Sequence, residues 1–172
     1  MTGCSVYSYR RLIEVDESIV WQMLYEAARA AEEGRLSPDS IRNDGYLAKY
    51  AAGWGRPGDI GVAAFENTSG RPVGAAWVRL LIGADEQDGC IDGHTPELAI
   101  GVMPAHRGQG VGTELLRLLF EAVRELFSGV TLTVRADSQA VRLYERFGFQ
   151  RLPGELVNRV GGQSVRMYAA WK

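Results

Sequence analysis

Apolar positions near the start of the chain change from a spacing of two to a spacing of three or four. Residues 6–15 alternate loosely between apolar and polar types and predict a first strand. Asp16 is expected to cap a helix that runs to about Glu33, because apolar side chains recur there at helical spacing. A second, less regular helical stretch is predicted for residues 37–53. The first third of the chain is therefore expected to be one strand followed by helices.

The middle of the chain has the pattern of antiparallel strands. Residues 60–65 and 72–82 are separated by a short polar turn that contains Gly, so they predict a hairpin. A loop rich in Asp, Glu and Gly over residues 83–95 precedes a third strand over residues 97–103. Gly101 lies inside this third strand, which predicts either a bulge or a close approach by another backbone.

The second half of the chain holds the clearest helix. From Val111 to about Leu126, apolar side chains form one stripe and charged side chains occupy the other faces, which predicts an amphipathic helix packed on a core. A short β-branched strand over residues 130–134 follows. Asp137 is then expected to cap another helix, which Gly148 ends.

The C-terminal part of the sequence returns to strands. Residues 149–152 and 165–171 are predicted strands, and residues 153–162 between them are predicted to form a loop. We find neither an internal repeat nor a linker long enough to divide the chain, and 172 residues suit one domain with a full core. Residues 1–172 are therefore expected to form a single domain.

Composition narrows the classes of partner. The net charge is −2 and no basic stripe is visible, which argues against a nucleic-acid-binding protein. No stretch approaches the roughly 18 apolar residues of a membrane span, and the first residues lack the apolar run of a signal peptide. Cys4 and Cys90 have no CxxC or metal-binding spacing, and unpaired thiols suit a reducing compartment. We therefore expect a cytoplasmic protein that binds neither nucleic acid nor membrane.

One glycine-rich stretch carries most of the chemical information. Residues 102–113 connect a predicted strand to the amphipathic helix and contain Gly108, Gly110 and Gly112. Glycine tolerates positive φ and lets the backbone approach a ligand closely, and the start of a helix adds N–H groups and the positive end of its dipole. Such a turn is suited to binding a pyrophosphate.

Other kinds of site are disfavoured because their patterns are missing. A P-loop needs Lys-Ser or Lys-Thr after its glycines, and neither dipeptide occurs in the chain. A dinucleotide fingerprint needs G-x-G-x-x-G, whereas this chain has G-x-G-x-G. His94 and His106 lack the short spacing of zinc ligands, so no metal is expected. A serine nucleophile is disfavoured because the chain has no G-x-S-x-G elbow.

Two signatures together resemble those of the GNAT N-acetyltransferase superfamily. The first is R-x-x-G-x-G, which residues 107–112 match as Arg-Gly-Gln-Gly-Val-Gly. The second begins at Asp137 and matches the family at Ala140, Leu143, Tyr144, Glu145, Gly148 and Phe149. The resemblance is strong over about residues 95–152, where the signatures occur in the right order with a helix and a strand between them. The family often has Asn where this chain has Asp137, which leaves open whether this position contacts CoA.

The resemblance implies a GNAT-like fold of the α/β (α+β) class, with a central, mixed, mostly antiparallel sheet of six or seven strands and helices on both faces. It implies acetyl-CoA as co-substrate and direct transfer of an acetyl group to a primary amine. The main-chain amides of the glycine-rich stretch would hold the CoA pyrophosphate, and a bulged strand would lie beside the pantetheine arm. The cofactor contacts that it implies are Ile100, Val102, Arg107, Gly108, Gln109, Gly110, Val111, Gly112, Thr113, Ser138 and Tyr144.

The same resemblance implies two catalytic residues. Tyr144 occupies the family's usual position for the acid that protonates the leaving thiolate, and a phenol with a reference pKa of ~10 stays protonated when a thiol of ~8.5 does not. Glu97 occupies the strand in which family members carry a glutamate that accepts the amine proton, commonly through water. His94 and bulk water remain alternative proton acceptors.

The acceptor is less well defined by the sequence. The family builds this site from its first helices and from the loop before the motif strand, here about residues 21–54 and 83–95, and the acceptor is either a small-molecule amine or a peptide amine. Acids in the second segment would attract a cationic amine, or would simply be solvated; they are Asp85, Glu86, Asp88 and Asp92. A homodimer is also expected. The alternative function is a non-catalytic acyl-CoA-binding sensor or interaction module.

Overall fold

A computed structural model of the chain describes residues 3–85, 91–154, 156–157 and 161–171. Its centre is one sheet with the strand order β1-β2-β3-β4-β5-β8-β6, and the short strand β7 pairs with β8 beside this path. The strands are β1 (Tyr7–Arg11), β2 (Ile60–Glu66), β3 (Pro72–Arg79), β4 (Glu97–Val102), β5 (Gly129–Arg135), β6 (Gln150–Arg151), β7 (Leu156–Val157) and β8 (Gln163–Ala170).

Neighbouring strands of this sheet are antiparallel except β4 and β5, which are parallel. The predicted mixed, mostly antiparallel sheet is therefore confirmed, with seven strands along the path. The two-residue strand β7 is an addition, because it lies within residues 153–162, which were expected to be a loop. Two residues give too little periodicity for a strand to be recognised in a sequence.

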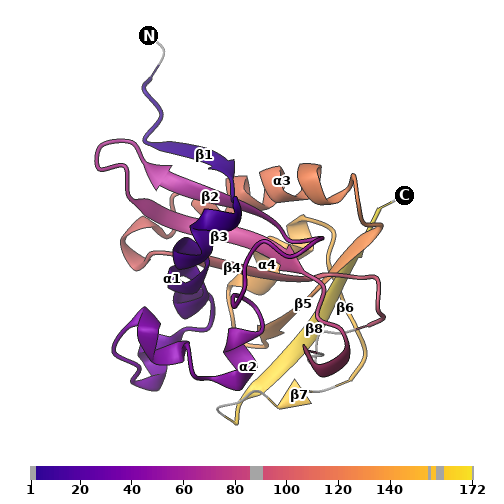
Figure 1. Ribbon diagram of the computed structural model, residues 1–172. Coiled ribbons are helices and arrows are strands. Elements are labelled where there is room, and N and C mark those ends of the chain that lie inside the picture. Colours follow the sequence, from indigo (N-terminus) through magenta and orange to yellow (C-terminus); the bar gives the residue numbers. More distant parts are fainter. Residues whose placement is uncertain (1–2, 86–90, 155, 158–160, 172) are drawn as a thin grey trace.

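Helices cover both faces of the sheet, as expected (Figure 1). The helices α1 (Glu17–Ala27) and α2 (Gly45–Ala48) pack on one face, and α3 (Val111–Val123) and α4 (Ala140–Arg146) pack on the other. On β3, Ala75 and Trp77 belong to the core under α1, whereas Ala76 and Val78 belong to the core under α3. A strand that is buried on both faces has no polar alternation, which is why its two cores could not be separated in the sequence.

The first predicted strand is shorter than expected. Strand β1 ends at Arg11, and residues 14–16 form a 3₁₀ turn. The carboxylate of Asp16 accepts hydrogen bonds from the Arg10 guanidinium and from the Ile13 amide. Asp16 therefore stands at the N-cap position of helix α1, as expected, but its side chain makes no cap hydrogen bond there and instead fixes the preceding turn.

The first predicted helix is also interrupted. Helix α1 ends at Ala27, and Arg29 adopts φ 54°, in the left-handed region that non-glycine residues rarely occupy. A short 3₁₀ helix, η2 (Ala30–Glu33), follows and ends at Gly34 with φ 81°. The predicted helical stretch over 37–53 is likewise reduced to a 3₁₀ turn at Pro38–Ile41 and the one-turn helix α2.

Gly101 is a place of close approach and not a bulge. The pairing of β3 with β4 runs without a register shift from Glu97 to Val102. A Cβ atom at Gly101 would collide with the carbonyl oxygen of Met23 in helix α1. Helix α1 therefore lies directly against β4, and only glycine leaves room for it.

The second signature helix begins later than predicted. Helix α4 starts at Ala140, and it is the Ser138 hydroxyl, not the Asp137 carboxylate, that accepts a hydrogen bond from the Ala140 amide. The predicted end is confirmed, because Gly148 follows the last turn with φ 90° and its amide bonds back to Glu145. Asp137 is left exposed at the edge of a cavity.

Candidate active site

The parallel strands β4 and β5 separate soon after they begin. Their register joins only Glu97 and Thr131, next to the hydrogen bond from the Thr131 amide to the Pro96 carbonyl. Beyond that pair the strands diverge, and we call this separation the split. A cavity of about 770 Å³ follows the split, with walls from α1, η2, α2, β4, β5 and α4. Its size lies within the usual range for small-molecule sites.

The glycine-rich stretch of residues 102–113, here called the glycine loop, forms one end of the cavity. Gly108 and Gly110 have φ of 72° and 83°, and a Cβ atom on either would meet nothing within 4 Å. Glycine is therefore required by backbone conformation, and the space over the loop is open. Gly110 is the N-cap residue of α3, whose first amides have no intrahelical partner. The loop offers N–H groups and the positive end of the α3 dipole to an anion.

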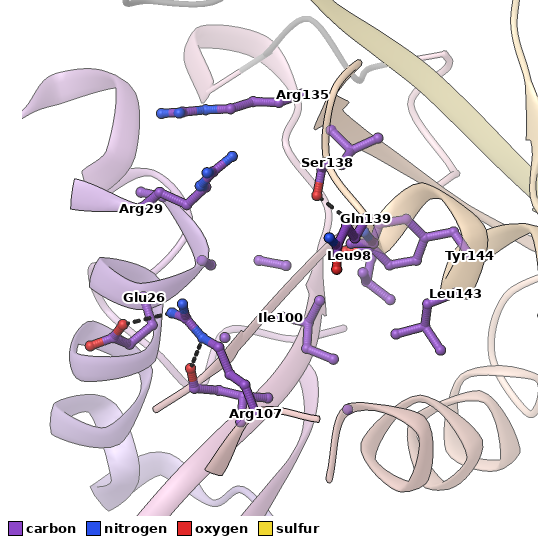
Figure 2. A pocket seen from close by; sticks show the side chains of 18 of the residues that line it. Glu26, Arg29, Leu98, Ile100, Arg107, Arg135, Ser138, Gln139, Leu143 and Tyr144 are labelled. Carbon is purple, nitrogen blue, oxygen red and sulfur yellow. Dashed lines mark hydrogen bonds and ion pairs between the residues drawn. The ribbon is translucent and has the colours of Figure 1, made fainter. Parts of the chain in front are cut away.

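Arg107 fastens the glycine loop to helix α1. Its Nε donates to the Val102 carbonyl at 2.9 Å and its Nη2 pairs with Glu26 Oε2 at 3.0 Å (Figure 2). Partial burial raises the pKa of Glu26, and the charge of Arg107 opposes this shift. The Arg107 guanidinium thus already has partners in the protein. It ties the glycine loop to α1 and also places a positive charge in the cavity wall.

All the predicted cofactor contacts line the cavity except Gln109. The Gln109 side chain turns away, because its Oε1 accepts from the Tyr7 hydroxyl at 2.7 Å and its Nε2 donates to the Ala105 carbonyl at 3.1 Å. Gln109 therefore links the glycine loop to strand β1. The sequence motif marks this position without indicating where its side chain points.

Helix α4 supplies the wall opposite α1. Tyr144 is only 7% exposed and lines the cavity together with Leu143 and Ser138. Its ring packs edge-on against Phe149 at 5.7 Å between centroids. Burial raises the pKa of the Tyr144 phenol above its ordinary value, so the hydroxyl stays protonated throughout the neutral range.

A carboxylate from β4 lies at the place where the split begins. Glu97 is 3% exposed, lines the cavity, and accepts a hydrogen bond from the Tyr50 hydroxyl at 2.7 Å. Tyr46 and Leu47 of α2 line the cavity beside Tyr50, so this region is an aromatic pocket with one buried acid. Of the aromatic residues in the first helices, Tyr46 and Tyr50 face the cavity, whereas Trp21, Tyr25 and Trp54 belong to the core.

Of the two candidate side chains for accepting the amine proton, Glu97 lines the cavity and His94 does not. His94 is exposed and lies outside the cavity lining, with its amide bonded to the Asp92 carboxylate. His106, by contrast, lines the cavity beside the glycine loop, and its Nδ1 lies 3.0 Å from the Tyr7 hydroxyl. Neither of the described acids of the 83–95 loop lines the cavity, since Asp85 pairs with Arg56 and Asp92 bonds to the residues that follow it. Glu86 and Asp88 lie outside the described residues.

The sequence did not indicate the charged cluster at the mouth of the cavity. This mouth cluster consists of Arg29, Glu32 and Glu33 near η2 and Arg135 at the end of β5. Arg135 pairs with Glu33 at 3.0 Å and approaches Glu32 at 3.8 Å, while Arg29 pairs with Glu32 at 2.8 Å. Figure 2 shows the side chains of Arg29 and Arg135 reaching over the cavity from opposite walls. The ion pairs thus cross the split and join the α1 side to the β5 side.

Neither a metal site nor a membrane-spanning helix is present in the part of the chain that the structure describes. No group of three or more His, Cys, Asp or Glu side chains there is arranged to hold a metal ion. Within the same residues, no helix combines the length and apolarity that crossing a bilayer requires.

Known structures share this architecture. The chain resembles yncA from Salmonella typhimurium, solved with its cofactor acetyl-CoA, at 22% identity and TM-score 0.67, over 96% of this chain and 94% of the other. It resembles ribosomal-protein-alanine N-acetyltransferase from Brucella melitensis at 21% identity and TM-score 0.67, over 95% and 99% of the two chains. A spermidine N-acetyltransferase SpeG chimera from Vibrio cholerae and hSSAT matches at 19% identity and TM-score 0.63, over 96% of each chain.

Identities at this level support only the shared fold. The family of the chain is given by a match to a family sequence profile. No curated protein sequence matches the chain. The profile of the acetyltransferase (GNAT) family matches residues 21–149, more than half of the 172-residue chain. The matched region contains the glycine loop, the split and helix α4. The chain therefore belongs to the acetyltransferase (GNAT) family and is an acetyl-CoA-dependent N-acetyltransferase.

Proposed function

We propose that the protein transfers the acetyl group of acetyl-CoA directly to the primary amine of a small molecule, within the split between β4 and β5. The observation that carries this proposal is the single register pair Glu97–Thr131, beyond which a cavity runs from the glycine loop past both Tyr144 and Glu97. One site can then hold donor and acceptor together, as direct transfer requires.

Acetyl-CoA fits the residues that line this cavity. The amides of Gly108, Gly110 and Gly112 would hold its pyrophosphate, supported by the open space where side chains are missing at the first two positions. Ile100 and Val102 of β4 and Ser138 before α4 would flank the arm that leads into the split. Bound in this way, the co-substrate supplies an activated acetyl thioester.

Tyr144 acts in this proposal as the proton donor to the thiolate that leaves when the acetyl group moves. A buried phenol with a raised pKa remains protonated and can give its proton to a thiolate, whose reference pKa of ~8.5 is lower than that of a phenol. Tyr144 lies in the cavity wall on α4, on the side of the sheet opposite Glu97. The two groups therefore act on opposite ends of the reacting atoms.

Glu97 acts as the acceptor of the amine proton, either directly or through one water molecule. Only the neutral amine has a free electron pair for attack, and its nitrogen must lose one further proton as the new C–N bond becomes an amide. Glu97 is a cavity-lining carboxylate, whereas His94 lies outside the lining, so the geometry favours Glu97. The proton count balances as follows: the ammonium form gives one proton to solvent before attack, the nitrogen gives a second to Glu97 as the amide forms, Tyr144 gives its proton to the thiolate, and the proton on Glu97 returns through solvent to Tyr144.

The acceptor is proposed to be a small amine because the cavity is limited. The cavity of about 770 Å³ must contain the arm of the co-substrate as well as the acceptor. Tyr46, Tyr50 and the mouth cluster enclose the part that would hold the acceptor, here called the acceptor side. Spermidine N-acetyltransferase and ribosomal-protein-alanine N-acetyltransferase are both among the similar folds, so the fold itself does not select between small and peptide amines.

A panel of acceptors tests this choice. CoA release would be measured with small mono- and polyamines, free amino acids, and peptides with N-terminal alanine or internal lysine. We expect turnover with at least one small amine and background rates with the peptides. Turnover with peptides only would refute the small-amine proposal. It would not test the roles of Tyr144 and Glu97, which are tested by substitutions at those two positions.

Three further properties expected from the sequence stay predictions. They are a cytoplasmic location, a homodimer, and a single N-acetyltransferase domain over residues 1–172. Cys4 is exposed as a free thiol, which agrees with a reducing compartment. Sedimentation of the purified protein would test the homodimer.

A further inference from the structure

Tyr50 and Glu97 are 47 positions apart in the sequence but meet in the cavity wall. The Tyr50 hydroxyl donates to Glu97 Oε1 at 2.7 Å, and the two residues are 8% and 3% exposed. A hydrogen bond between a phenol and a carboxylate at this distance is short and directional. Because both groups line the cavity, their contact lies at the reacting end of the acceptor side.

The backbone around Tyr50 is held firmly against β3. Trp77 Nε1 donates to the Tyr50 carbonyl at 2.9 Å, and Arg79 Nη1 donates to the carbonyls of Lys49 and Ala52. Arg79 is itself fixed by Asp59 at 2.8 Å, with both side chains almost fully buried. The phenol of Tyr50 is therefore presented to Glu97 from a rigid segment.

Arg79 is the charged residue that the register brings opposite Glu97. It lies on β3, but its guanidinium is turned to Asp59 and to backbone carbonyls. Among the described residues, Thr131 on β5 is the parallel register partner of Glu97, Tyr46 packs beside Tyr50, and Arg135 lines the same cavity. Arg135 is paired with Glu33, so its charge is balanced within the mouth cluster.

We propose that Tyr50 is a positioning residue for Glu97, which it holds toward the split and keeps ionised at neutral pH. The proposal rests on the assignment of Glu97 as the proton acceptor. Donation of a hydrogen bond to a carboxylate stabilises its charged form, and the same bond fixes the orientation of the carboxylate by turning Oε1 to Tyr50. The orientation of a base on β4 is thereby set by a side chain from the turn that follows α2.

The pH dependence of Tyr50→Phe tests the proposal. Without the hydrogen bond the pKa of Glu97 rises, so more of the enzyme is protonated and inactive at low pH. The acidic limb of kcat/KM should move upward by about one pH unit, so that the loss of activity in Tyr50→Phe grows as the pH falls along that limb and is smallest on the plateau above it. Tyr25→Phe is the matched control, because it removes another buried phenol, whose hydroxyl donates to the Arg35 carbonyl, away from Glu97.

A second readout does not depend on turnover. The carboxyl carbon of Glu97 can be followed by NMR in protein labelled with ¹³C-glutamate and assigned with Glu97→Gln. Its titration midpoint should be about one unit higher in Tyr50→Phe than in wild type or Tyr25→Phe. If Tyr50→Phe does not fold, 3-fluorotyrosine at position 50 supplies a more acidic donor of nearly the same size, and the midpoint should fall instead.

The outcomes separate this proposal from the assignment on which it rests. Full activity of Glu97→Gln would remove Glu97 as the base. Loss of activity in Glu97→Gln combined with an unmoved Glu97 midpoint in Tyr50→Phe would refute the role of Tyr50 alone. The proposal also requires that Tyr50→Phe has less than about a twofold effect in the Glu97→Gln background, because its action passes through that carboxylate.

Discussion

The two sides of the split supply their chemistry by different means. On one side, the glycine loop and the start of α3 offer backbone amides, and only Gly108 and Gly110 among these residues need special backbone angles. On the other side, side chains come from distant parts of the sequence, such as Tyr50 after α2 and Glu97 on β4. A backbone site restricts residue types, whereas a side-chain site permits many solutions. We infer that the donor side follows family rules and the acceptor side is specific to this protein.

The largest effect should come from removing the base on the acceptor side. Glu97→Gln keeps the size of the side chain but cannot accept the amine proton, so kcat should fall by about 10³-fold. Affinity for acetyl-CoA, measured by calorimetry, should stay within about twofold of wild type if the two sides are separable. A large loss of affinity would show that the sides are not independent.

Tyr144→Phe should have the next largest effect. Removing the proton donor to the thiolate is expected to lower kcat by about 10²-fold, with little change in acetyl-CoA affinity. Because burial raises the Tyr144 pKa above its usual ~10, this phenol should cause no loss of wild-type activity below about pH 10. A wild-type alkaline limb near pH 8 that disappears in Tyr144→Phe would contradict this account.

Gly110→Ala should weaken the donor side without affecting the acceptor side. The new Cβ would occupy the space over the glycine loop, and the dissociation constant for acetyl-CoA should rise about tenfold, a change of about 1.4 kcal/mol. Its stability should fall by about 1 kcal/mol because φ is 83°. Gly70→Ala is the matched control, since Gly70 has φ 67° and similarly open surroundings but lies in the β2–β3 turn. It should lose similar stability and keep normal affinity.

The smallest effect is expected at the mouth cluster. Glu32 is half exposed and pairs with Arg29, so Glu32→Gln should change the free energy of unfolding by no more than about 1 kcal/mol. Because Arg29 and Arg135 line the cavity, the KM of the acceptor should change several-fold, with acetyl-CoA affinity unaffected. Steady-state kinetics at two salt concentrations would check this, since screening should reduce the difference.

The contrast between the two sides also explains what the sequence could predict. Gly108, Gly110 and Tyr144 were identified because a helix start with positive φ admits few residues and because the family signature includes the tyrosine. The order of strands around the hairpin and the α3 helix followed from periodicity. These are local properties, and local patterns record them well.

Other features depend on contacts that no local pattern contains. Arg29 carries no mark of its left-handed conformation, which interrupts the predicted helix. Asp16 bonds to the turn before its helix, and Ser138 rather than Asp137 accepts a hydrogen bond from the Ala140 amide, so residue type alone does not show which contact a polar side chain makes. The meeting of Tyr50 with Glu97 depends on how the segment after α2 packs on β3, and this packing is known only from the fold.

The location of the donor site is the central claim, and amide chemical shifts test it most directly. Uniformly ¹⁵N-labelled protein would be titrated with CoA, which binds without reacting. We predict that the largest shifts occur at Gly108, Gly110, Gly112 and Ser138, with smaller shifts along β4 beyond Glu97. Shifts gathered elsewhere, for example on strand β1 around Tyr9, with the glycine loop unchanged, would contradict the account.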